Sequence, residues 1–366
     1  MTTDASVAHR SHNFSAGPAV LPLEVLKTAR EELLNYRGSG SSIMELSHRG
    51  PEYMEVDAQA RERLIRLLGL GDDFEVMFLQ GGASTQFMMV PTNYLVQGRT
   101  ADYLNTGAWA KKAIKEAKMI GDVNVAFSSE EGNFNRVPRD EEIRMSDNPV
   151  YLHFTSNNTI FGTQQPKEPE SKGVPLVCDA SSDFLSRPVD AARYGLIYAG
   201  AQKNAGPSGV TIVIVRKDFL EQARTDGVPS MLRYKTHTGT MFNTPPTFGV
   251  YLVNLVLGWL ETQGGLAAIE RYNQEKAKLI YDQIDHDDFY RTPVEKESRS
   301  LMNVVFRLPT EELEKAFLKE AESRDMHGLK GHRSVGGLRA SIYNACPRES
   351  VEALAEFMKD FRSRNG

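Results

Sequence analysis

Seven short apolar runs, separated by helix-like segments, constrain the fold of this chain more than any other feature of its sequence. Several of the runs are continuously apolar, which is typical of β-strands covered on both faces. The runs are Glu75–Leu79, Asp102–Leu104, Val123–Phe127, Val150–Phe154, Leu176–Cys178, Leu196–Tyr198 and Val210–Val215. Helical patterns such as Trp109–Met119 lie between them. This alternation predicts an α/β fold with a large, mainly parallel sheet.

The pattern changes after about Gly264, where longer amphipathic helices replace the short apolar runs. The expected order there is helix, strand, helix, strand, helix: Leu266–Ile284, Met302–Phe306, Glu311–Glu322, Leu338–Ile342 and Arg348–Arg362. Such a set predicts a smaller C-terminal α/β domain. We therefore expect a flexible N-terminal extension at 1–12, a large domain at 13–264 and a small domain at 265–366.

Composition excludes several classes of function. The chain has 366 residues and a formal net charge of -5, so it lacks the basic face that a nucleic-acid partner requires. The most apolar stretch, Tyr251–Leu260, is too short to cross a bilayer. The N-terminus has no apolar signal core, and the two cysteines cannot form a disulfide framework. We expect a cytoplasmic protein without membrane or nucleic-acid partners.

Lys203 and Asp179 are the first candidate catalytic residues. Lys203 follows an apolar strand and lies in a loop rich in small residues, where a desolvated lysine becomes nucleophilic. Asp179 closes another strand-like run, and adjacent parallel strands would bring both residues to one sheet edge. A lysine paired with an aspartate is a mark of enzymes that use pyridoxal 5′-phosphate (PLP). The alternatives are a solvated loop lysine and an aspartate that caps a turn.

Two further segments fit a site for this cofactor. Gln80–Gln86 is a glycine-rich turn between a strand and a helix, with Ser84 as the expected N-cap, and such a turn offers free N–H groups to a phosphate. Trp109 stands at a strand-to-helix turn, where its indole could stack on a pyridine ring. Taken alone, the turn is a weak motif and Trp109 could be an ordinary core aromatic.

The combination of motifs closely resembles the phosphoserine aminotransferase family, a class V group of PLP enzymes of fold type I. The matching segments run from near one end of the chain to near the other: Asn13–Ala19, Met44–Gly50, Gly81–Phe87, Ser181–Pro188, Ile197–Gly209 and His332–Asn344. The resemblance implies a large domain with a mainly parallel seven-stranded sheet and a small C-terminal α/β domain.

The resemblance also implies a role for each residue that would hold the cofactor. Lys203 would form the Schiff base and Asp179 would pair with the pyridinium. The cofactor-binding residues would be Ala83, Ser84, Trp109, Thr159, Asp179, Gln202, Lys203, Asn243 and Thr244. Asn243 and Thr244 match the pair that reaches the phosphate from the neighbouring subunit, which implies a homodimer with shared active sites. No metal is implied.

Six residues match the family's substrate-binding set: Ser15, His48, Arg49, His332, Arg333 and Arg339. Arg339 would hold the α-carboxylate, because a planar guanidinium donates two parallel hydrogen bonds. The two His-Arg pairs would bind the phosphate, or the distal carboxylate of glutamate. The implied reaction converts O-phospho-L-serine and 2-oxoglutarate into 3-phosphohydroxypyruvate and L-glutamate, in L-serine biosynthesis. Bacterial members also act in pyridoxine biosynthesis, on the route to 4-phosphohydroxy-L-threonine.

Three other readings stay open. The chain could be another class V aminotransferase, such as the alanine–glyoxylate type, or a cysteine desulfurase. A desulfurase requires a cysteine on a mobile loop, whereas Cys178 is expected in a strand and Cys346 near the start of the last helix. A PLP-binding regulator without turnover is the alternative from outside enzymology.

Overall fold

A computed structural model describes residues 9–239 and 241–366. Residues 1–8 of the predicted N-terminal extension lie outside this description. The short strand β1 (His12–Asn13) pairs in parallel with β12 (Met326–His327). The end of the extension therefore lies against the C-terminal part of the chain. The proposed domain boundaries remain a prediction.

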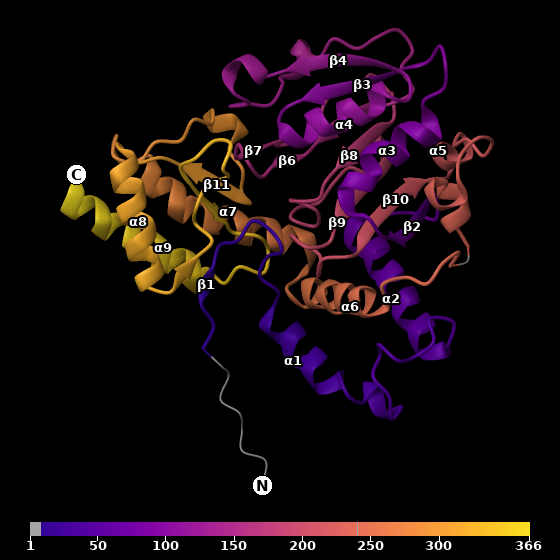
Figure 1. Cartoon of the computed structure of the whole chain (residues 1–366), viewed down its shortest axis with the longest axis horizontal. Coiled ribbons are helices and arrows are strands. Elements are labelled where there is room, and N and C mark those ends of the chain that lie inside the picture. Colours follow the sequence, from indigo (N-terminus) through magenta and orange to yellow (C-terminus); the bar gives the residue numbers. More distant parts are fainter. Residues whose placement is uncertain (1–8, 240) are drawn as a thin grey trace.

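A seven-stranded sheet forms the centre of the larger part of the molecule (Figure 1). Its order is β2-β10-β9-β8-β5-β3-β4, and the seven predicted runs are these seven strands. Their bounds are β2 Phe74–Leu79, β3 Thr100–Asn105, β4 Asp122–Ser128, β5 Leu152–Thr155, β8 Leu176–Asp179, β9 Tyr194–Gly200 and β10 Thr211–Arg216. The sheet is mainly parallel, as predicted, but β10 runs antiparallel to both of its neighbours.

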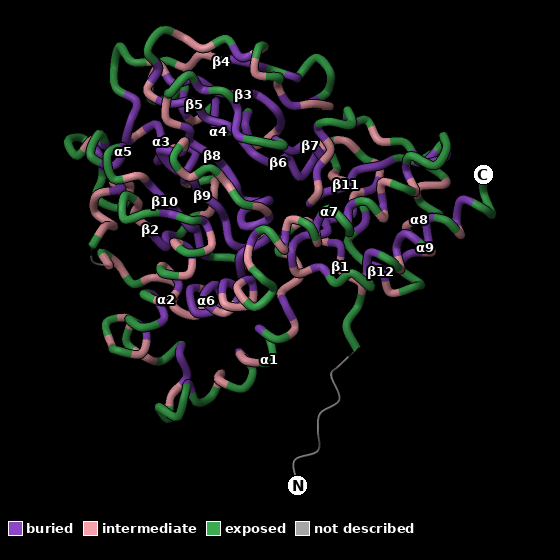
Figure 2. Tube along the Cα trace, turned by 180° about the vertical axis from the view of Figure 1, so that it is seen from behind, coloured by how far each residue is buried: buried purple, intermediate pink, exposed green. Residues whose placement is uncertain are grey.

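Helices cover both faces of the sheet because alternate strand residues point to opposite sides. In β10, Ile212 and Ile214 join one buried apolar cluster, whereas Val213 and Val215 join another. The first cluster includes residues of α1 (Leu23–Glu32), α2 (Pro51–Leu68) and α6 (Thr247–Thr262). The second includes residues of α3 (Gly82–Tyr94), α4 (Ala108–Lys118) and α5 (Lys217–Glu221). Figure 2 accordingly shows the central strands β8 and β9 largely buried.

The C-terminal part has its own buried cluster and lies beside one end of the sheet (Figure 1). It contains α7 (Gly265–Ile284), α8 (Glu311–Ser323), α9 (Arg348–Asn365) and the antiparallel strands β11 (Asn303–Phe306) and β13 (Leu338–Ser341). A small ribbon of β6 (Asn157–Asn158) and β7 (Thr163–Gln164) lies between this part and the sheet. All five predicted elements of this region are present, each within a few residues of its expected bounds.

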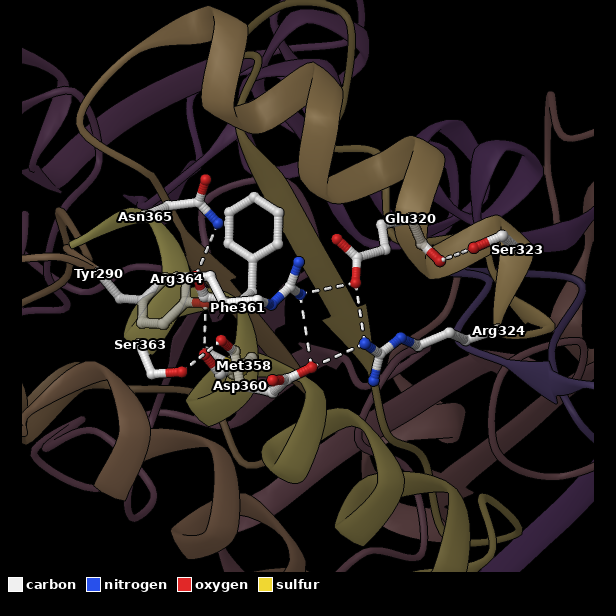
Figure 3. Close-up of polar contacts among 10 residues, drawn as sticks. All are labelled: Tyr290, Glu320, Ser323, Arg324, Met358, Asp360, Phe361, Ser363, Arg364 and Asn365. Atoms are coloured by element: carbon white, nitrogen blue, oxygen red, sulfur yellow. Dashed lines mark hydrogen bonds and ion pairs between the residues drawn. The ribbon is translucent and has the colours of Figure 1, made fainter.

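Ion pairs join the outer surfaces of α8 and α9. Arg324 donates to Glu320 at 2.8 Å and to Asp360 at 2.7 Å, and Arg364 reaches the same two carboxylates at 2.6 and 3.4 Å. Figure 3 shows this closed set of four charges beside the aromatic ring of Phe361. The arrangement links the last helix to the rest of the C-terminal part.

Among the described residues, no single helix is both long and apolar enough to cross a membrane. Helices α6 and α7 together reach that length and composition, but they meet at a bend of 82°.

Candidate active site

Lys203 and Asp179 lie at the same edge of the sheet, at the carboxyl ends of the adjacent parallel strands β9 and β8. Asp179 is the last residue of β8, and Lys203 follows β9 by three residues. Ligands of α/β sheets bind at this edge. The structure therefore brings together the two residues that the sequence singled out first.

The carboxylate of Asp179 is buried and held in one orientation by Ser181. The Ser181 backbone N–H and hydroxyl both donate to Oδ1, at 3.1 and 2.6 Å. Oδ2 has no hydrogen-bond partner among the described residues, so it is free to accept a hydrogen bond from a protonated nitrogen. Burial raises the pKa of Asp179, while the hydrogen bonds from Ser181 and the nearby charge of Lys203 act against this shift. The sequence analysis did not identify Ser181, although its place two residues after Asp179 is typical of such a turn.

The amine of Lys203 is in the environment that a nucleophilic lysine requires. Desolvation lowers the pKa of Lys203 to about 8; Asp179 opposes this shift and Arg339 adds to it. The Nζ atom lies 5.4 Å from the centre of the Trp109 ring. The backbone at Gly17 passes so close that a Cβ there would lie 3.2 Å from Cγ of Lys203. The backbone at Gly17 thus lies directly against the Lys203 side chain.

Hydrogen bonds connect Trp109 to Arg339 through one residue, Thr159. The Trp109 Nε1–H donates to the Thr159 hydroxyl at 3.1 Å, and Nη1 of Arg339 donates to the Thr159 carbonyl oxygen at 3.0 Å. The Nε–H of Arg339 is buried and has no partner in the described part of the chain. Three predicted site residues from three separate segments therefore meet beside Lys203.

The glycine-rich turn forms the N-terminus of α3, but its cap differs from the prediction. Ser84 is inside the helix, and the N-cap is Gly81, whose φ of +91° favours glycine. A Cβ at Gly81 would lie 1.9 Å from the Thr85 hydroxyl, which explains why no larger residue fits. The N–H groups of Ala83 and Ser84 belong to the first helical turn, which has no intrahelical acceptors. The turn is therefore still suited to bind a phosphate.

The structure adds Lys112 to the positively charged residues expected around the site. Burial lowers the pKa of His332, and the charges of Arg339, Arg333 and Lys112 lower it further, so all three cations influence this histidine. Lys112 lies one helical turn after Trp109, and its Nζ is 4.4 Å from the centre of that ring. The i, i+3 spacing from Trp109 was the only signal for Lys112 in the sequence.

Other predicted residues make no hydrogen bond to the Lys203 side chain within the described part of the chain. Arg49, next to the half-buried His48, donates to the Met241 carbonyl at 3.5 Å. Asn243 donates to the Gln80 side chain at 2.9 Å, and the Thr244 carbonyl accepts from that side chain at 3.3 Å. Gln202 directly precedes Lys203 in the chain, and its carbonyl oxygen accepts from the Ala19 N–H at 2.9 Å.

The described part of the chain contains no cluster of three His, Cys, Asp or Glu side chains that could hold a metal ion.

Comparisons with known proteins agree with this geometry. The family model for class-V aminotransferases matches residues 11–354. The phosphoserine aminotransferase of Herpetosiphon aurantiacus is 54% identical over 97% of this chain and 99% of its own length. The solved phosphoserine aminotransferase from Bacillus circulans subsp. alkalophilus is 55% identical, with a TM-score of 0.95 over 98% of this chain and 99% of that one. The PLP-bound enzyme from Trichomonas vaginalis is 40% identical, with a TM-score of 0.91 over 96% and 100% of the two chains. This chain therefore belongs to the phosphoserine aminotransferase family of class-V aminotransferases.

Proposed function

We propose that this chain is a PLP-dependent enzyme that transfers the amino group between O-phospho-L-serine and 2-oxoglutarate, in the synthesis of L-serine. One observation carries the proposal. The amine of Lys203, whose pKa is lowered to about 8, is influenced by the charges of both Asp179 and Arg339, and Asp179 ends the strand beside the one that leads to Lys203. The charges of Arg339, Arg333 and Lys112 act together on His332. The pairing of Lys203 with Asp179 is typical of a PLP enzyme. The group of cations suits an amino acid that carries two negatively charged groups.

The residues present fit the cofactor. Oδ2 of Asp179 is free to pair with the pyridine nitrogen, and Trp109, held by Thr159, would cover the ring. The N-terminus of α3, with Ala83, Ser84 and the nearby Gln202, would hold the phosphate. When bound, PLP supplies a carbonyl carbon that exchanges its attached nitrogen and a ring that withdraws electrons from the substrate Cα.

The protein's own groups then bind the substrate and move its proton. The Arg339 guanidinium, with its free Nε–H, would hold the α-carboxylate and so orient the Cα–H bond toward Lys203. The Lys203 amine would take the Cα proton as a general base and would deliver it to C4′ of the cofactor, so that hydrolysis can release the oxo acid. Its lowered pKa keeps a substantial neutral fraction near physiological pH.

The two cysteines disfavour a desulfurase. Both Cys178 and Cys346 are buried. Burial raises the pKa of the Cys178 thiol, and it raises that of Cys346 to about 11. A protonated, buried thiol is a poor nucleophile.

A coupled assay tests the proposed function. The purified chain with PLP, phosphoserine and 2-oxoglutarate should form glutamate, which glutamate dehydrogenase detects. Alanine with glyoxylate should give far less turnover. The reverse preference would favour the alanine–glyoxylate type, and binding of PLP without turnover on either pair would favour a regulator. Activity in pyridoxine biosynthesis remains a separate prediction.

We also propose a homodimer in which Asn243 and Thr244 reach the active site of the neighbouring subunit, together with His48 and Arg49. Among the described residues, no hydrogen bond joins these four residues to Lys203: Arg49 donates to Met241, and Asn243 donates to Gln80 at the start of the glycine-rich turn. Large apolar side chains are exposed close by in the sequence: Met44 at 53%, Met54 at 45% and Phe242 at 48%. Such exposure is typical of a protein interface.

A further inference from the structure

We propose that Lys112 is a specificity-determining residue that binds the phosphate of the substrate side chain and favours it over a carboxylate. The proposal rests on the proposed function, because it concerns the same site. None of the motifs found in the sequence includes this residue.

The position of Lys112 at the site follows from α4. Trp109 and Lys112 are three residues apart, so they lie on the same face of the helix. The Lys112 ammonium is 4.4 Å from the centre of the indole, and that of Lys203 is 5.4 Å from the same centre. Both cations therefore border one ring.

Hydrogen bonds also connect this indole ring to Arg339, another cation of the site. Trp109 donates to Thr159, whose carbonyl accepts from Arg339. The charges of Lys112, Arg333 and Arg339 all act on His332. Lys112 thus belongs to one electrostatic cluster with the predicted phosphate residues, although it comes from a different element.

Lys112 has no ion-pair partner among the described residues, and its neighbour shows what a structural lysine looks like on this helix. Lys111 binds Glu130 at 2.6 Å, so an internal carboxylate neutralises its charge. Both side chains are exposed. Like charges gathered without a counter-charge attract an anion from solution.

The charges of the two substrates' side chains give a quantitative expectation. A phosphate monoester carries a charge of about -1.5 to -2 near neutral pH, whereas the glutamate side chain carries one negative charge. Coulomb energy is proportional to each charge. Loss of one cation should therefore weaken phosphoserine binding by roughly the square of the factor by which it weakens glutamate binding.

Kinetics of the PLP-loaded enzyme test this, with Lys111→Ala as the matched control because it makes the same change in net charge one residue away. For Lys112→Ala we expect the KM for phosphoserine to rise about tenfold and that for glutamate about threefold, with kcat nearly unchanged. Competitive inhibition by inorganic phosphate should weaken in parallel with phosphoserine. Lys112→Arg, which keeps the charge, should restore phosphoserine binding.

Equal increases in both KM values would overturn the proposal, because they would mean that Lys112 affects both substrates alike, for example by orienting Trp109. Unchanged KM values, or the same effect from Lys111→Ala, would overturn it as well. If the wild-type enzyme fails to convert phosphoserine at all, the proposed function is wrong, and that result is distinct from a wild-type enzyme whose selectivity does not depend on Lys112.

Discussion

Lys203 and Lys276 are both lysines whose pKa burial lowers to about 8, yet they differ in what surrounds the amine. The Nζ of Lys276 donates to three carbonyl oxygens, those of Ile342, Tyr343 and Cys346, at 3.1, 2.7 and 3.2 Å. The Nζ of Lys203 makes no such bond to any residue that the structure describes, and it lies beside an aromatic ring. The lowered pKa therefore does not distinguish the two lysines, whereas their hydrogen bonds do, because the Lys276 amine already has three acceptors.

The pKa of Lys203 predicts how fast the chain takes up PLP. Only the neutral amine attacks the cofactor's carbonyl, and the pKa is lowered from 10.5 to about 8, so the neutral form dominates above that pH. The rate of PLP incorporation into the cofactor-free chain should rise with pH up to about 8 and then level off. Stopped-flow absorbance measures it, and a rate that keeps rising to pH 10 would contradict the environment described.

Asp179→Asn separates the charge of this residue from its shape. The amide Oδ1 can still accept both hydrogen bonds from Ser181, so the fold should keep its stability. Loss of the negative charge should lower kcat by at least about a hundredfold, because preorganised charge is a large term in catalysis. Denaturation and steady-state kinetics measure the two effects, and a variant with near-normal kcat would remove Asp179 from the mechanism.

At the scale of elements, the pattern of apolar runs predicted all seven strands of the sheet, because buried strands need continuous apolar sequence. It did not predict the direction of β10, since an apolar run reads the same in either orientation. The predicted N-cap of α3 was also wrong. Ser84 has the side chain of a typical N-cap, but the left-handed backbone at Gly81 decides where the helix begins.

The start of α3 gives a prediction with its own control. Gly81→Ala would place a Cβ 1.9 Å from the Thr85 hydroxyl, so the first helical turn must shift. Gly82→Ala has a similar positive φ of +65° but open space around the Cβ. We expect Gly81→Ala to weaken PLP binding strongly and Gly82→Ala to cost about 1–2 kcal/mol of stability with less effect on PLP. Absorbance titration and thermal denaturation compare them; equal PLP affinities would exclude this turn as the phosphate site.

At the scale of the whole molecule, the sequence of one chain predicts only part of the site. Sequence placed Lys203 and Asp179 together because strand ends of a parallel sheet converge. Thr159 and Arg339 required the resemblance, since they are 180 residues apart in sequence and no local pattern links them. Lys112 required the structure. In residues 9–239 and 241–366, no hydrogen bond joins Lys203 to His48, Arg49, Asn243 or Thr244, so their roles depend on the proposed dimer.

Hybrid dimers test whether the sites are shared. Lys203→Ala and the double variant Asn243→Ala/Thr244→Ala should each be nearly inactive. After the two are dissociated and reassembled together, roughly one quarter of wild-type activity should return, because half of the dimers are mixed and each has one intact site of two. No recovery, although purification through a different affinity tag on each variant shows mixed dimers, would mean that each site is built within one subunit.

The most direct test of the account is to locate the lysine that holds the cofactor. Borohydride reduction of the PLP-loaded chain fixes the cofactor on its lysine, and peptide mass mapping then identifies the residue. We predict a single phosphopyridoxyl group on Lys203 and none in Lys203→Ala. A label on Lys276 or on any other lysine, or no label at all, would contradict the account.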